Sequence, residues 1–250
     1  ARGGGIAIFI SLVGGLLACR LFVENPLHEV FGLLPALSLV FFVGLLDDKF
    51  SLKPLHKLVL VVLAAVLAAW VLDAVAIVPG LLLVALVVYI TNAVNLLDGA
   101  NGLAGGVMVI FFAAAAMIFW MAKLPDYTLT ALLIIPAIIG FLLFNIKGKL
   151  FMGDCGSLLL GFLAGIFLMK LSQTSSVLFL GGLLALLIPI ADTAFVIVKR
   201  ILSGNSLLHG DLNHTYNLLL GKSGSLGVML VVYYTVAVIL AVGGVLIAGG

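Results

Sequence analysis

Charged residues are scarce in this chain. Its 250 residues include 12 Lys and Arg and 10 Asp and Glu, which makes 9% charged side chains against 64% hydrophobic ones. An ordinary soluble domain carries about 25% charged residues, so this composition, with a mean hydropathy of +1.40, excludes that class. The net charge of +2 comes without a stripe of basic residues, and we therefore expect no nucleic-acid partner.

Cysteine is equally scarce. The two cysteines, Cys19 and Cys155, fall in or beside apolar segments. The sequence contains no disulfide framework, no CxxC pair and no Cys/His spacing typical of a metal site. The chain opens with Ala1-Arg2-Gly3 and has neither a methionine nor a signal-peptide pattern at its start. We therefore expect that its true N-terminus has been removed.

Long apolar runs fill most of the chain. A helix needs roughly 17–25 apolar residues to cross a bilayer, and nine stretches of about that kind are present. They are approximately residues 4–19, 28–46, 54–72, 79–97, 100–121, 127–144, 155–171, 176–200 and 225–248. This pattern predicts an all-α fold, a polytopic integral membrane bundle of about nine transmembrane helices that forms one domain over residues 1–250.

The basic residues between these stretches fall mainly on one side. If the stretches alternate in direction, nine basic residues lie on the side of the N-terminus and three on the other. The nine are Arg2, Lys49, Lys53, Lys57, Lys147, Lys149, Lys199, Arg200 and Lys222, and the three are Arg20, Lys123 and Lys170. An excess of Lys and Arg marks the cytoplasmic side, so the first set is predicted to be cytoplasmic.

Most of the acidic residues fall on the same side as the nine basic ones. The aspartates there are Asp47, Asp48, Asp98, Asp154 and Asp211, and Asp192 approaches this face from inside the eighth stretch. A carboxylate at or near membrane depth is costly and marks a functional site by default. On the opposite side we interpret the remaining acids as solvated loop charges: Glu24, Glu29, Asp73 and Asp126.

These polar residues form four polar islands. The first island, residues 44–57, contains Asp47, Asp48 and Lys57. Adjacent carboxylates can attract Mg²⁺, a hard cation that prefers oxygen ligands, or one of them can act as a base. Lys57 can meet a phosphate as a point charge. The alternative is a charged interfacial loop without a chemical role.

The second island is residues 92–102. Asn92 and Asn95 are one helical turn apart, and Asp98 continues their face if the helix holds. Their side chains offer hydrogen bonds to a nucleotide or sugar and oxygens to a metal, while Gly99 allows close backbone approach. The alternative is a turn between helices with asparagine caps.

The third island, residues 144–157, runs from Asn145 near its start to Asp154 near its end. Because it ends where the seventh stretch begins, the backbone N–H groups of residues 153–157 can form an anion-binding helix start. Asp154, with glycines and lysines around it, suits a metal-bridged diphosphate. The alternative is a simple N-cap.

The fourth island combines Asp192 with the polar residues of the last loop. Those loop residues are Asn205, His209, Asp211, Asn213, His214, Tyr216 and Asn217. His214 can donate to a phosphate, or donate and accept through its two ring nitrogens; the alternative is a surface histidine. Asp192 lies in an apolar helix and needs a partner or a cavity. Periodicity does not decide whether residues 200–224 contain an amphipathic or re-entrant segment.

Together the islands resemble the polyprenyl-phosphate N-acetylhexosamine-1-phosphate transferase family. The stretches that carry the resemblance are GLLDDKFSLKPLHK (44–57), NAVNLLDGANGLAGG (92–106), FNIKGKLFMGDCGSLLLG (144–161) and PIADTAFVIVKR (189–200). The opening GGIAIF (4–9) is similar to the start of the family's second helix. The resemblance therefore implies a first helix missing from this chain, which would bring the family's usual total to ten.

The resemblance implies an Mg²⁺-dependent enzyme (with Mn²⁺ as an alternative) of the bacterial cytoplasmic membrane, with its active site on the cytoplasmic face. A polyprenyl phosphate, such as undecaprenyl phosphate, would attack the β-phosphorus of a UDP-N-acetylhexosamine and release UMP, the first membrane step of cell-wall or surface glycan synthesis. A homodimer is also allowed. Residue by residue, the implied roles are catalysis for Asp47 and Asp48, metal binding for Asp154 and Asn95, and substrate binding for Lys57, Asn92, Asn95, Asp98, Asn145 and His214.

One motif departs from the family. Many bacterial members carry Asp-Arg-x-His-x-His-His in the last loop, whereas this chain has Asp-Leu-Asn-His-Thr-Tyr-Asn at residues 211–217. Recognition of the sugar or its phosphate is therefore expected to differ. The long loops of the branch that uses a muramyl-pentapeptide donor are also not evident, which favours a simple N-acetylhexosamine donor.

Two other functions stay open on the sequence alone. A secondary transporter would place its carboxylates near span centres within inverted repeats, but here they gather at one face and no repeat is seen. A CDP-alcohol phosphotransferase would cluster its metal-binding aspartates in one motif, whereas these are spread over the four polar islands.

Overall fold

The structure is a computed structural model that describes residues 3–22, 27–74, 77–203 and 214–250, and helices are the only extended regular elements in these ranges. The helices are α1 (Gly4–Phe22), α2 (His28–Phe50), α3 (Pro54–Val71), α4 (Ile77–Leu97), α5 (Leu103–Met121), α6 (Pro125–Asn145), α7 (Gly153–Thr174), α8 (Ser176–Ala185), α9 (Leu187–Leu202), α10 (Thr215–Ser223) and α11 (Leu226–Gly249). Within the described residues, eight helices are long and apolar enough to cross a membrane, and α8 with α9 makes a ninth span if that bent pair is one. The predicted all-α membrane bundle is confirmed.

The helices begin where the sequence supplies suitable residues. In a bilayer each segment must satisfy its own backbone hydrogen bonds, which a helix does. Pro54 opens α3, where its missing N–H costs nothing. Ser175 caps α8 by accepting the N–H of Val177 at 3.2 Å, and Ser225 caps α11 through the N–H of Val228 at 3.4 Å. Apolar length and capping thus account for these elements.

The eighth predicted span, 176–200, is not one straight helix. It breaks at Leu186 into α8 and α9, which meet at an angle of 71°. Pro189 lies in the first turn of α9 and has no N–H to donate to the carbonyl four residues earlier, so a continuous helix would lose that bond. This stretch is therefore two helices and not the one helix that the apolar run predicted, although its residues are helical as expected.

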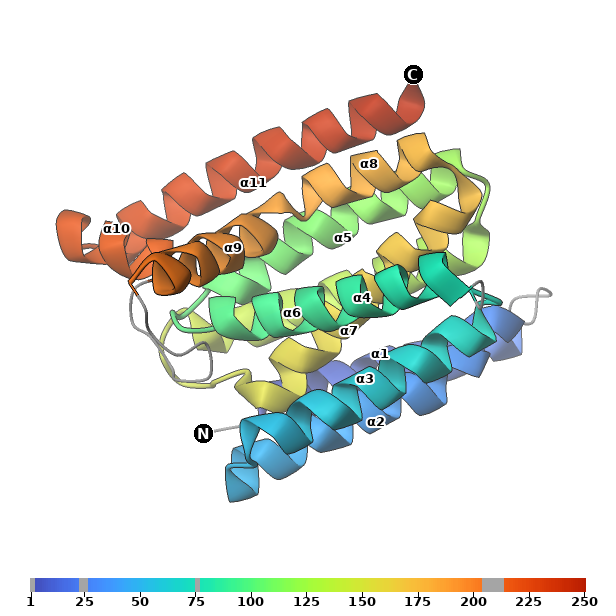
Figure 1. Cartoon of the computed structure of the whole chain (residues 1–250), viewed down its shortest axis with the longest axis horizontal. Coiled ribbons are helices and arrows are strands. Elements are labelled where there is room, and N and C mark those ends of the chain that lie inside the picture. Colours follow the sequence, from blue (N-terminus) through green and yellow to red (C-terminus); the bar gives the residue numbers. More distant parts are fainter. Residues whose placement is uncertain (1–2, 23–26, 75–76, 204–213) are drawn as a thin grey trace.

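Helix α7 forms the centre of the bundle. Of the residues in its membrane-spanning part, 89% are buried. Figure 1 shows α1, α2 and α3 on one side of α4 and α7, with α8 and α11 on the other. Two glycines let the neighbouring backbones approach α7 closely. A Cβ at Gly44 of α2 would lie 2.4 Å from the Cα of Cys155, and one at Gly161 would lie 2.8 Å from the Cα of Thr91 in α4. These contacts bring the polar ends of α2, α4 and α7 together.

The far ends of α2 and α7 are joined by an ion pair. Lys170 Nζ lies 2.7 Å from both carboxylate oxygens of Glu29 and 5.3 Å from the centre of the Tyr127 ring. The sequence predicts a solvated loop charge at Glu29, and this prediction is wrong because the carboxylate is bonded across two packed helices. Since the polar islands join the other ends of the same helices, α2 and α7 are tied at both ends.

Candidate active site

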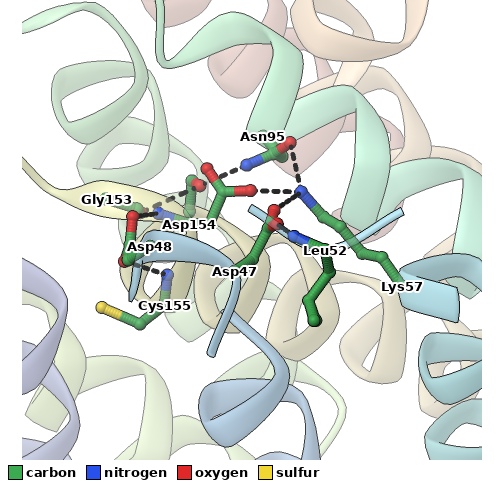
Figure 2. A network of polar contacts seen from close by, with 9 residues as sticks. Asp47, Asp48, Leu52, Lys57, Asn95, Gly153, Asp154 and Cys155 are labelled. Atoms are coloured by element: carbon green, nitrogen blue, oxygen red, sulfur yellow. Dashed lines mark hydrogen bonds and ion pairs between the residues drawn. The ribbon is translucent and has the colours of Figure 1, made fainter. Parts of the chain in front are cut away.

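Lys57 lies at the centre of a network that joins three of the polar islands. Its Nζ is 2.9 Å from Oδ2 of Asp47 and 3.4 Å from Oδ1 of Asn95, and it also contacts Oδ2 of Asp154. Figure 2 shows the ammonium between these three side chains. They come from α2, α4 and α7, while Lys57 itself lies in the first turn of α3. The structure thus brings Asp47, Lys57, Asn95 and Asp154 together, as the sequence predicted.

Asp47 is held in place by the turn that follows α2. The chain reverses at Ser51, which has a left-handed φ of 51°. This turn directs the N–H of Leu52 onto Oδ1 of Asp47 at 2.7 Å, which leaves Oδ2 for Lys57. Asp47 therefore fixes the position of the ammonium from one side, with both of its oxygens engaged.

Asp48 is used differently from its neighbour. Its carboxylate accepts the backbone N–H of Asp154 at 3.0 Å and that of Cys155 at 3.1 Å, so it caps the start of α7. A carboxylate at this position is favoured by the free N–H groups and by the helix dipole. The anion expected at this helix start is therefore supplied by Asp48 of the same chain. Gly153, at φ +73°, leaves no room for a side chain, because its Cβ would lie 2.5 Å from Oδ2 of Asp48.

Ser157, a residue for which the sequence motifs imply no role, orients Asn95. Nδ2 of Asn95 donates to Oγ of Ser157 at 2.8 Å, and that hydroxyl donates to the carbonyl of Gly153 at 3.1 Å. The amide oxygen of Asn95 therefore faces Lys57. Ser157 lies one turn after Asp154 on α7, and this spacing is the signal in the sequence that places it on the same face.

A polar cavity of about 510 Å³, called the cleft below, opens beside this network. It is lined mainly by the first three polar islands, and its lining residues are Asp47, Asp48, Ser51, Leu52, Asp98, Gly99, Ala100, Asn101, Asn145, Phe151, Met152, Gly153 and Asp154. Burial, with the charges of Asp154 and Asp48, raises the pKa of Asp98 from an ordinary 3.8 to about 8. Repulsion between carboxylates that face one cavity is a feature typical of functional sites.

Asn145 lines the cleft but its amide is engaged by the backbone. Its Oδ1 accepts the N–H of Gly102 at 2.6 Å, and its Nδ2 donates to the carbonyl of Leu150 at 2.8 Å. The side chain is 4% exposed. Asn145 therefore ties the turn after α4 to the loop before α7, and in the structure it shapes the cleft through these two bonds.

A second cavity of about 740 Å³, called the groove below, lies between α3, α4 and α9. Its wall is largely apolar, with residues such as Leu58, Val84 and Val196, and Asn92, Arg200 and His214 supply polar groups. We expected Asn92 to share the face of Asn95 and Asp98, but it lines the groove instead, and its Nδ2 donates to the carbonyl of Val88 at 2.8 Å.

His214 and Asp192 form a buried pair. Nδ1 of His214 lies 2.7 Å from Oδ2 of Asp192, and the rings of His214 and Tyr216 stack with centroids 5.5 Å apart. The partner that Asp192 required in an apolar helix is therefore His214. Four other members of the fourth polar island lie outside the described residues: Asn205, His209, Asp211 and Asn213.

The carboxylates around Lys57 fit a divalent cation. Asp47 and Asp154 both direct an oxygen at one cation, the ammonium of Lys57, and Asn95 directs its amide oxygen there. In the described ranges, no three His, Cys, Asp or Glu side chains form a complete metal cage. Mg²⁺ commonly binds one or two carboxylates and takes its remaining ligands from water and substrate phosphates, so this donor set suits it.

These features define an integral membrane protein that places an acidic cleft and an apolar groove in one helical bundle. The model of glycosyl transferase family 4 matches residues 30–172, more than half of the chain. The chain belongs to glycosyl transferase family 4.

Several curated proteins are similar to it. A probable undecaprenyl-phosphate N-acetylglucosaminyl 1-phosphate transferase of Bacillus subtilis is 30% identical over 264 aligned positions, which cover 98% of this chain and 73% of that protein. A decaprenyl-phosphate N-acetylglucosaminephosphotransferase of Mycolicibacterium smegmatis is 32% identical, with 92% and 68% covered. A phospho-N-acetylmuramoyl-pentapeptide-transferase of Clostridium beijerinckii is 31% identical, with 72% and 63% covered.

Proposed function

We propose that this protein transfers N-acetylhexosamine-1-phosphate from a UDP-N-acetylhexosamine to a polyprenyl phosphate and releases UMP. This would be the first membrane step in making a cell-wall or surface glycan. The observation that carries the proposal is the presence, in one bundle, of an acidic cleft beside Lys57 and an apolar groove whose lining includes Arg200 and His214. The relatives from Bacillus and Mycolicibacterium support it, since their names describe N-acetylglucosamine phosphate transfer to polyprenyl phosphates.

Each cavity suits one substrate. The cleft offers carboxylate oxygens for a metal-bound diphosphate and Lys57 beside them as a positive charge. The groove offers an apolar wall for an isoprenoid chain, and His214 and Arg200 for the phosphate at its end. Burying an apolar chain against such a wall is favourable by about 25 cal/mol per Å². The donor therefore belongs in the cleft and the lipid acceptor in the groove.

The reaction brings two anions together. In the direct route, an oxygen of the lipid phosphate forms a bond to the β-phosphorus of the donor, the bond from that phosphorus to the bridging oxygen breaks, and UMP leaves with the electron pair. Lys57 offsets the charge of the phosphates. A phosphate monoester has a second pKa of about 6 and is largely dianionic at pH 7, so the nucleophile needs no base. The role of Asp47 is then to hold Lys57.

The metal completes the charge balance. Mg²⁺, or Mn²⁺ as the alternative, would be held by Asp154 with Asn95 nearby, and when bound it supplies charge neutralisation for the diphosphate and the leaving UMP. Asp48 acts indirectly, because its bonds to the start of α7 fix where Asp154 lies. Asp98 and Asn145 also line the cleft, and the nucleotide would lie against them.

The active site would face the cytoplasm of a bacterium. The excess of Lys and Arg on the loops that carry the polar islands supports this orientation. Two routes fit the chemistry, direct attack by the lipid and a phospho-aspartate intermediate. Exchange of labelled UMP into the donor in the absence of lipid would support the intermediate, and exchange that requires the lipid would support direct attack.

The test is UMP release by the purified protein from a panel of UDP-sugars, with polyprenyl phosphate and with or without Mg²⁺. We expect release that depends on both the lipid and the metal, and we expect Asp154→Asn to abolish it. Asp73→Asn, in the exposed turn after α3, is the matched control and should behave like the wild type. Folded protein that releases no UMP from any donor would overturn the proposal, and near-normal activity in Asp154→Asn would overturn the metal role.

A further inference from the structure

Asp192 is a buried carboxylate with several donors. It is 3% exposed, and besides His214 it accepts the N–H of Thr215 at 2.8 Å and the hydroxyl of Thr215. That hydroxyl lies 2.6 Å from the hydroxyl of Tyr233 in α11. The carboxylate therefore connects α9 with the start of α10 and, through Thr215, with α11.

The pair fixes which nitrogen His214 presents to the groove. An ionised carboxylate only accepts hydrogen bonds, so Nδ1 of His214, at 2.7 Å from Asp192, carries the proton that it shares. The second nitrogen, Nε2, is on the other side of the ring, and His214 lines the groove. Tyr216 stacks on the ring at an interplanar angle of 16° and limits its rotation. A ring nitrogen donates to a phosphate only when it carries a proton, so a His214 that binds phosphate through Nε2 is an imidazolium with both nitrogens protonated. The Asp192 carboxylate offsets the positive charge of that ring and fixes its orientation.

The groove contains a second polar group, on the residue that follows Asp192 in α9. Thr193 follows Asp192, is 4% exposed, and its hydroxyl has no hydrogen-bond partner among the described residues. Thr193 and Arg200 both line the groove, and they are seven residues apart on one face of α9. A buried hydroxyl without a partner costs free energy unless a ligand supplies one. A hydroxyl, an imidazole and a guanidinium are suitable groups to bind a phosphate.

We propose that Asp192 is a positioning residue, which orients His214 so that its Nε2–H, together with the Thr193 hydroxyl, binds the phosphate of the lipid acceptor in the groove. The inference rests on the proposed function and deepens it. Asp192 touches no substrate itself; it acts through the ring of His214.

The critical variant is Asp192→Asn. Its amide oxygen can still accept from Thr215, but its amide N–H₂ would face Nδ1 and require that atom to accept, so the ring can no longer bind as an imidazolium and Nε2 donates as a neutral N–H. We expect the KM for polyprenyl phosphate to rise about tenfold, because a charge-assisted hydrogen bond to the phosphate becomes a neutral one. The KM for the UDP-sugar should not change. Tyr233→Phe removes the bond to Thr215 but leaves the pair of Asp192 with His214, so it is the matched control and should keep the wild-type KM for the lipid.

A double-mutant cycle separates positioning from a purely structural role. If Asp192 acts through His214, then Asp192→Asn should have no further effect on the lipid KM in a His214→Gln background. Equal effects in both backgrounds, or an unchanged lipid KM in Asp192→Asn, would overturn the inference. The wild type is assayed in parallel, and if it releases no UMP the proposed function itself fails.

Thr193→Val keeps the test decisive if Asp192→Asn does not fold. It keeps the shape of the side chain and removes the hydroxyl without a partner, so the unfolding midpoint should stay equal or rise while the lipid KM rises. Unchanged lipid KM in both Thr193→Val and His214→Gln would overturn the phosphate site, and with it the role of Asp192.

Discussion

Replacing the two adjacent aspartates at the end of α2 should have different effects on the stability and the activity of the protein. Asp48 accepts two backbone N–H groups at the start of α7, at 3.0 and 3.1 Å. Asp47 accepts one backbone N–H and bonds Lys57. Replacement of Asp48 should therefore lower the stability of the protein and its activity together, whereas Asp47→Asn should lower activity with little change in stability.

The magnitude follows from the bonds that are lost. A hydrogen bond to a charged group contributes about 1.5–3 kcal/mol, so two of them at the lower end give about 3 kcal/mol for Asp48→Ala. In a domain of this size each kcal/mol shifts the unfolding midpoint by about 2–4 °C, which predicts a decrease of about 6 °C or more. Asp47→Asn keeps an acceptor for Leu52, and Lys57 keeps Asp154, so its decrease should be about 1 kcal/mol or less.

The assay is thermal unfolding of the detergent-solubilised protein without substrates, combined with UMP release. Asp73→Asn serves as the control, because Asp73 is exposed and has φ 52°, a conformation that asparagine tolerates. If Asp48→Ala unfolds within about 2 °C of the wild type, Asp48 is not the cap that holds α7. If Asp47→Asn is as unstable as Asp48→Ala, the separation of roles is refuted.

Two further predictions concern the turn after α4. A Cβ at Gly99 would lie 1.8 Å from the hydroxyl of Tyr216, so Gly99→Ala should displace Tyr216, destabilise the protein by about 1–3 kcal/mol and raise the lipid KM. Adding Tyr216→Phe should restore part of the stability and part of the lipid KM. Full activity in Gly99→Ala would show that this contact does not matter. Asp98 has a pKa of about 8 in the folded protein and about 3.8 when unfolded, so the folded state holds more protons between these values and stability falls as pH rises from about 4 to 8. In EDTA, Asp98→Asn should reduce that fall in the unfolding midpoint, and an unchanged pH profile would contradict it.

The spans and the gathering of the polar islands could be predicted from the sequence because both depend on composition along the chain. Nearly every apolar stretch long enough to cross a bilayer is one helix in the structure. The break at Leu186 was missed because both halves are equally apolar, and Pro189 was the signal that could have indicated it. The short helix α10 could not be decided, since its nine residues are too few for a clear period.

The division of work among the site residues could not be predicted in the same way. Asp47 and Asp48 are adjacent and chemically identical, and only the approach of α7, allowed by Gly44, gives one of them the helix start to cap. Asn145 has an amide side chain of the kind that binds substrates, yet this amide bonds two backbone segments. Such assignments depend on the direction that a side chain takes after the helices have packed, and a sequence motif does not determine that direction.

The place where the two substrates can react follows from the helices that line both cavities. On α4, Asn92 lines the groove and Asn95 faces Lys57, while Asp98, in the turn directly after α4, lines the cleft. Asn92 and Asn95 are three residues apart, or about 4.5 Å along the helix axis, so the lining of the groove and the network around Lys57 lie within about one helical turn of each other on α4. On α3, Leu58 lines the groove directly after Lys57. Because reacting atoms must approach to about 3–3.5 Å, a donor in the cleft and an acceptor in the groove can meet only at their boundary, beside Lys57 and Asn95.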